Sequence, residues 1–108
     1  MKKIIDGKLY NTATAKQIAS ACSDLPQSDF GWWSEELYLT KNGAWFIAGQ
    51  GGALSQWSQP YGSNGSCGSC GIKPLTESEA QQWLENSELD SGFDEVAILE
   101  SHFKIESA

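Results

Sequence analysis

The sequence has 108 residues, of which 40% are hydrophobic and 19% charged, a composition typical of one globular domain spanning residues 1–108. Its formal net charge is −7 and it contains no arginine, so we expect no direct binding of nucleic acid. The N-terminal residues lack the apolar stretch of a signal peptide, and no run approaches the roughly 18 apolar residues of a membrane span. We therefore expect a cytoplasmic protein with no membrane contact.

The first predicted element is a β-hairpin at the N-terminus. Asp6-Gly7 suits a two-residue type I′ turn, which would pair Ile4 with Leu9 across the two strands. The next predicted element is a helix over residues 14–23, because apolar side chains recur there at the helical spacing i, i+3, i+4, i+7. These side chains are Ala15, Ile18, Ala19 and Cys22.

A second hairpin is predicted around Asn42-Gly43, which lies between two β-prone runs. Pairing Lys41 with Ala44 sorts the side chains into two faces, and each face carries large apolar groups. One face holds Leu37, Leu39, Phe46 and Ala48, and the other holds Tyr38, Thr40, Trp45 and Ile47. A half-solvated sheet would place polar groups outward, so both faces need cover from the domain itself or from a partner.

Residues 49–71 are predicted to form a long glycine-rich loop. Seven of the eleven glycines lie there, and no charged residue occurs from Asn42 through Ile72. Loops of this length in compact domains are often binding loops, and the aromatic residues within it favour a contact surface. Combined with the outer face of the second hairpin, the loop gives a candidate binding surface made of Tyr38, Trp45, Ile47, Trp57 and Tyr61.

The C-terminal third contains a predicted edge strand and helices. Residues 72–75 fit a short edge strand, and Thr76 with Glu79 forms a capping box that opens a helix over residues 77–87. A short helix and then a strand over residues 103–106 are expected to follow. The predicted fold class is therefore α+β, with a small antiparallel sheet built from two β-hairpins plus a short strand and packed with two or three helices.

Cys67 and Cys70 form a CxxC motif, which can supply half a zinc site or a redox pair. A zinc site would need further ligands, and Cys22 and His102 are the other sulfur and imidazole groups available. The motif also does not open a helix after a strand, as a thioredoxin-like pair does. We interpret the cysteines as free thiols and predict no metal and no cofactor.

The sequence contains no recognisable catalytic constellation. Gly49–Gly52 lacks the spacing of a nucleotide-binding loop and is more simply explained as a bulge or a tight exit from a strand. His102 shows no triad spacing, and we interpret the adjacent acids as solvated surface rather than an acid/base pair. These acids are Glu35 and Glu36, and Asp94 and Glu95. We predict no catalytic residue and favour a non-enzymatic protein that binds another protein or a second copy of itself.

Two alternatives of different classes remain open. Residues 77–106 hold nine acids against Lys104 alone, which suits an acidic decoy that inhibits a nucleic-acid-binding host defence system. In that case Glu85, Glu88 and Asp90 would contact a basic protein surface. The second alternative is a small ligand-binding protein or enzyme that uses loop 49–71, which requires a concave pocket with converging polar groups beside Gly49–Gly52.

Several segments, in this order along the chain, resemble a set of small uncharacterised bacterial proteins carried on plasmids, prophages and integron gene cassettes. The segments are Lys3–Tyr10, Thr12–Ala15, Leu37–Gly43, Gly49–Gly52 and Pro74–Glu77, followed by Glu79, Ala80 and Trp83. The resemblance spans about residues 2–85, and Cys67, Cys70 and the acidic end do not belong to it. It implies a shared fold and a mobile-element setting, and no functional residue follows from it.

Overall fold

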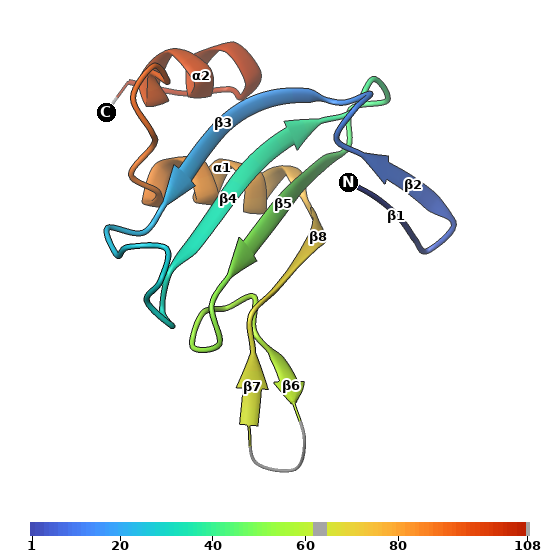
Figure 1. Ribbon diagram of the computed structural model, residues 1–108. Helices are drawn as coiled ribbons and strands as arrows, with labels where there is room; N and C mark the ends of the chain where they lie inside the picture. The colour runs from blue at the N-terminus through green and yellow to red at the C-terminus, as the bar shows by residue number, and fades with distance from the viewer. Residues whose placement is uncertain (62–64, 108) are drawn as a thin grey trace.

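The computed structural model describes the backbone of residues 1–61 and 65–107 and the side chains of residues 1–58 and 68–107. These residues form an α+β fold, as predicted (Figure 1). Its elements in chain order are β1 (Lys2–Ile5), β2 (Lys8–Asn11), β3 (Lys16–Cys22), β4 (Trp33–Leu39), β5 (Trp45–Gly51), β6 (Gln59–Tyr61), β7 (Gly65–Cys67), β8 (Ser69–Leu75), α1 (Glu77–Asn86) and α2 (Glu95–His102).

A four-stranded antiparallel sheet in the order β3-β4-β5-β8 forms the centre of the fold. Helix α1 crosses behind this sheet in Figure 1, whereas the β1–β2 hairpin lies at the side of β5 and β8. The long loop predicted over residues 49–71 is wrong, because β5 extends to Gly51 and β8 begins at Ser69. Between them β6 and β7 pair as a hairpin that projects from the lower end of the sheet. The sheet thus has helices on one face, which we call the helix face, and the N-terminal hairpin over part of the other, which we call the hairpin face.

The β4–β5 turn is one residue longer than predicted. As a result, the β5 side chains lie on the opposite face from the one expected, relative to those of β4. Thr40, rather than Lys41, pairs with Ala44: its N–H donates to the Ala44 carbonyl at 2.8 Å. Gly43 then takes a positive φ of 85°, as the last residue of a three-residue turn with a bulge requires. A slip of one residue moves side chains to the opposite face. The helix face therefore carries Leu37, Leu39, Trp45 and Ile47, and the hairpin face carries Tyr38, Phe46 and Ala48.

The helix predicted over residues 14–23 is wrong, because this segment forms the edge strand β3. A bulge between Gln17 and Ala19 turns Ile18 and Ala19 both toward the interior. Two adjacent buried residues interrupt the period-two pattern of a strand and imitate helical spacing. Cys22, the fourth member of the predicted stripe, is exposed.

Each face of the sheet has its own hydrophobic cluster. The cluster on the helix face contains Ile18, Ala19, Leu37, Trp45, Ile47, Ala80, Leu84 and Phe103. The cluster on the hairpin face contains Tyr10, Tyr38, Phe46, Ala48 and Ile72. In the second cluster the ring of Tyr38 stacks on Phe46 at 5.2 Å, and Tyr10 meets Phe46 edge-on at 5.5 Å. The apolar groups on both faces of the β4–β5 hairpin are thus covered by the same chain.

The N-terminal hairpin forms as predicted. Asp6 and Gly7 both have positive φ, at 51° and 76°, and Ile4 pairs with Leu9. Tyr10 on β2 is buried against the sheet, whereas Ile4 and Leu9 point away from it and are exposed.

The capping box and the edge strand near Ile72 are also confirmed. Thr76 Oγ1 accepts from the Glu79 backbone N–H, the Glu79 carboxylate accepts from the Thr76 backbone N–H, and β8 with its Pro74 lies at the sheet edge.

The strand predicted over residues 103–106 is wrong, because the chain is irregular there. Phe103 instead stacks on Trp45 at 5.2 Å, so packing rather than strand pairing positions this segment. Among the described residues, neither helix has the length and apolarity needed to cross a membrane.

Tyr38 gives the hairpin-face cluster a measurable pH dependence. Burial raises the pKa of the Tyr38 hydroxyl to about 12, with further contributions from its hydrogen bond to Glu36 and the charge of Glu36. The folded state therefore retains this proton above the unfolded pKa of about 10, and stability should fall as the pH rises from about 10 to about 12. Thermal melts of Tyr38→Phe should show a smaller decrease over this range than melts of the original protein. Parallel decreases would contradict this assignment.

Candidate functional site

Glu35 on β4 is the one charged side chain that is buried within the described residues, at 7% exposure. Its Oε2 atom accepts from Gln56 Nε2 at 2.9 Å and from the indole Nε1 of Trp57 at 2.8 Å. Its Oε1 atom accepts from Trp83 Nε1 at 2.8 Å. The carboxylate thus joins three elements: β4, the segment after β5 and helix α1.

Three N–H donors compensate the burial of this carboxylate in place of a cation. Hydrogen bonds to ionised acceptors contribute roughly 1.5–3 kcal/mol each, whereas an unpaired buried donor costs roughly 1–3 kcal/mol. Loss of the carboxylate would leave the partly buried indole N–H groups of Trp57 and Trp83 without an acceptor. Glu35 therefore fixes the position of residues 55–58 against the sheet.

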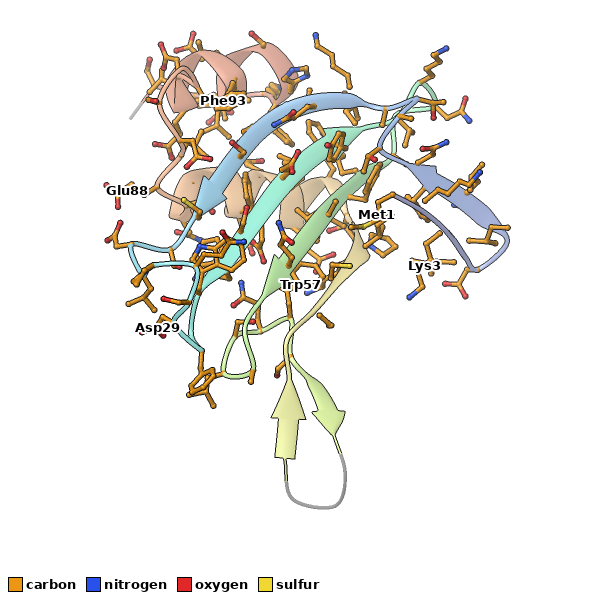
Figure 2. The ribbon with its side chains drawn as sticks, viewed as in Figure 1. Met1, Lys3, Asp29, Trp57, Glu88 and Phe93 are labelled. Carbon is orange, nitrogen blue, oxygen red and sulfur yellow. The ribbon has the colours of Figure 1, made fainter. Side chains whose placement is uncertain are left out.

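Trp57 lies over two glycines of the sheet, toward its lower end (Figure 2). A Cβ atom at Gly49 would stand 2.1 Å from the Trp57 ring, and one at Gly71 would stand 3.5 Å from it. Gly49 therefore leaves the space that the indole fills. Gly49 lies within β5 rather than at its exit, so the packing of Trp57 accounts for this glycine.

The segment after β5 is also joined to the β3–β4 loop. The Gly52 N–H donates to the Trp32 carbonyl at 2.8 Å, and the Leu54 N–H donates to the Phe30 carbonyl at 2.7 Å. A Cβ atom at Gly52 would lie 2.4 Å from the Phe30 carbonyl oxygen, so only glycine permits this approach. The two loops form one connected end of the sheet.

Exposed apolar side chains gather on these joined loops. Phe30 is 68% exposed, Leu54 is 76% exposed and Leu25 is 44% exposed. The backbone bond between Leu54 and Phe30 keeps these two together, and Leu25 lies beside Gly31. Asp29 of the same loop is labelled at this end of the sheet in Figure 2. We call Leu25, Phe30 and Leu54 the loop-end patch.

The binding surface predicted from the sequence does not form as an exposed surface in the described residues. Tyr38 is 8% exposed, Trp45 is 6% exposed and Ile47 is 5% exposed. The helices cover Trp45 and Ile47, and the N-terminal hairpin covers Tyr38. Trp57 is half-buried and bonded to Glu35, and the side chain of Tyr61 lies outside the described residues.

The remaining candidates are not brought together by the fold. His102 packs edge-on against Trp45 at 5.6 Å. Cys70 is a free, exposed thiol, while the side chain of Cys67 lies outside the described residues. No group of three or more potential metal ligands occurs in the described part of the chain.

Asp90, one of the acids assigned to the decoy alternative, is used within the fold. Its carboxylate accepts from Ser20 Oγ at 2.7 Å and from Cys22 Sγ at 3.5 Å. Loss of hydration, followed by the hydrogen bond to Asp90 and its charge, raises the pKa of the Cys22 thiol, which lowers its reactivity at neutral pH. Asp90 therefore holds the edge strand β3, whereas Glu85 and Glu88 are exposed.

Sequence reasoning missed Glu35 and the loop-end patch. Glu35 was expected to be solvated, yet it shares the β4 face of Trp33, Leu37 and Leu39, which alternate at period two. That alternation was the signal that Glu35 points inward. Phe30 and Leu54 gave no such signal, because their proximity depends on contacts between two loops.

Comparisons with protein-family models, with curated proteins and with solved structures found no match to this chain. The resemblance to bacterial mobile-element proteins therefore stays a prediction.

Glu35→Gln should destabilise the protein by about 2–4 kcal/mol, because an amide cannot accept all three hydrogen bonds and leaves a buried N–H unpaired. Glu36→Gln is the matched control: it is the next residue on β4, and its amide oxygen can still accept from the Tyr38 hydroxyl. We expect this control to lose less than about 1 kcal/mol. Urea denaturation followed by circular dichroism measures both. Equal losses would contradict the role assigned to Glu35.

Gly49→Ala should cost about 1–3 kcal/mol, because its Cβ atom overlaps the Trp57 ring. Gly71→Ala, whose Cβ would make an ordinary contact with the same ring, should change stability by less than about 0.5 kcal/mol. Chemical denaturation gives the stabilities, and tryptophan fluorescence reports displacement of the indole. The assignment fails if both variants are equally stable.

Proposed function

We propose that this protein is a non-enzymatic binding module that recognises another protein through the loop-end patch. The observation that carries the proposal is the exposure of Phe30 and Leu54 on two loops that are joined by backbone hydrogen bonds. Apolar side chains exposed together on a small domain are typical of contact surfaces. The sequence around Leu54 supports this use, because residues 42–72 carry no charge to be desolvated on binding, whereas Asp24 and Asp29 flank Leu25 and Phe30 at the rim of the patch.

Pre-organisation of the patch strengthens the proposal. Association costs less free energy when the contacting segment is already ordered. Glu35 holds Gln56 and Trp57, and the adjoining Gly52 and Leu54 are bonded to the β3–β4 loop. Hence the patch needs little rearrangement to meet a partner.

A cytoplasmic location and a mobile-element setting belong to the same proposal and rest on the sequence alone. The decoy reading also remains a prediction, with Glu85 and Glu88 as the exposed acids that would carry it.

Phe30→Ser combined with Leu54→Ser should abolish partner binding with little loss of stability, because both side chains are exposed. Ile4→Ser combined with Leu9→Ser is the matched control, since these exposed apolar residues lie on the N-terminal hairpin. A photo-crosslinking residue at position 54 identifies the partner in bacterial cells, and one at Val96, exposed on α2, reports background. A discrete adduct at position 54 that is lost in the patch variant supports the proposal. Identical adducts from positions 54 and 96, or binding unchanged in the patch variant, would refute it.

A further inference from the structure

Two shallow hollows lie on the part of the hairpin face that the β1–β2 hairpin leaves uncovered. One, of about 330 Å³, is lined by residues that include Gln27, Trp32, Gln50 and Cys70. The other, of about 130 Å³, shares Gln50 and Cys70 and adds Ser34 and Glu36. The two hollows adjoin each other at Gln50 and Cys70, and we call them together the depression. Met1, labelled in Figure 2, lines the smaller hollow.

The strand register places polar side chains side by side in this depression. Ser34 on β4 pairs with Gln50 on β5, and Gln50 pairs with Cys70 on β8. Glu36 lies two residues beyond Ser34 on the same face of β4. Polar groups from three neighbouring strands therefore converge beside Gly49–Gly52, where the ligand-binding alternative required them.

Several hydrogen-bonding groups in the depression have no partner among the described residues. The side chains of Gln27, Ser34 and Gln50 make no hydrogen bond to the described residues, and neither does the indole N–H of Trp32. By contrast, the indole N–H groups of Trp57 and Trp83 are both bonded to Glu35. The amides and the hydroxyl can each donate and accept, so they suit a ligand that does both.

The charge of the lining narrows the class of ligand. Glu36 is the one charged side chain that lines the depression, and its Oε2 atom already accepts from the Tyr38 hydroxyl at 2.8 Å. An anionic ligand would meet this carboxylate, and the one cation among the lining residues, the N-terminal ammonium of Met1, already donates to Thr12 Oγ1 at 3.0 Å. A purely apolar ligand would remove water from Gln27 and Gln50 and would offer no hydrogen bonds in place of those lost to water. A neutral ligand rich in hydroxyl groups satisfies both constraints.

We propose that this depression binds a neutral saccharide. The half-buried indole of Trp32 offers an apolar surface to the C–H face of a sugar ring, while Gln27, Gln50 and Ser34 bond its hydroxyl groups. The free oxygen of Glu36 accepts a further hydroxyl. The shallow, open shape suits a chain of sugar units lying across the strands. This activity goes beyond the proposed protein-binding function and does not depend on it.

The test uses an array of neutral glycans that includes oligomers of glucose, galactose and N-acetylglucosamine, followed by isothermal titration calorimetry with the glycan bound. Trp32→Ala and Gln50→Ala should each weaken the affinity about 10-fold or more, the effect of losing one good contact. Gln17→Ala is the matched control, because Gln17 is an exposed glutamine on β3 outside the depression. It should bind with unchanged affinity.

Two further measurements serve as controls: the thermal stability of the variants, and glycan binding by the variant of the loop-end patch. Thermal melts verify that Trp32→Ala and Gln50→Ala remain folded, and Trp32→Phe, which keeps an aromatic face, should retain part of the affinity. The Phe30→Ser, Leu54→Ser protein should still bind the glycan, so failure of the protein-binding proposal is separable from failure of this one. The inference is overturned if no neutral glycan binds, or if folded Trp32→Ala and Gln50→Ala proteins bind as well as the original.

Discussion

The buried carboxylate of Glu35 is the interaction on which the functional end of this protein depends. The period-two pattern of β4 places Glu35 on the helix face of the sheet. There its carboxylate accepts hydrogen bonds from three N–H groups of two other elements. A buried carboxylate without such donors would be costly, so the donors and the acceptor constrain each other. The result is that a single side chain bonds to both α1 and the segment after β5, in addition to the core packing of Ala80 and Leu84 and the backbone bonds of Gly52 and Leu54.

The bond between Trp57 and Glu35 also explains why a glycine is needed at position 49. Trp57 can reach Glu35 only by lying on the sheet surface, and Gly49 provides the space for its ring. The chain then turns at Gly51 and Gly52, where the approach to the β3–β4 loop leaves no room for a side chain. Thus the part of this glycine-rich, uncharged segment from Gly49 to Trp57, which resembles a flexible linker in composition, is a bonded support for exposed side chains. Both proposed sites adjoin this support: the loop-end patch at its end and the polar depression on its sheet face.

Sequence reasoning succeeded where structure is determined by neighbouring residues. The Asp6-Gly7 turn, the capping box at Thr76 and the edge strand with Pro74 all depend on local backbone chemistry, and all were predicted. It failed for β3 and for the faces of the β4–β5 hairpin, because a bulge and a one-residue change in turn length invert side-chain patterns. The candidate sites were not predictable in detail, since they depend on contacts between residues far apart in the chain. Glu35 and Trp83, for instance, are separated by 48 residues.

The most direct test of the central claim is the hydrogen-exchange rate of individual indole N–H groups, measured by NMR. In the arrangement described, the indole N–H protons of Trp57 and Trp83 are bonded to a buried carboxylate, whereas that of Trp32 has no partner among the described residues. We expect the indole N–H protons of Trp57 and Trp83 to exchange with solvent much more slowly than that of Trp32. Exchange of all three at the same fast rate would show that Glu35 does not hold these side chains, and the support for the loop-end patch would be lost.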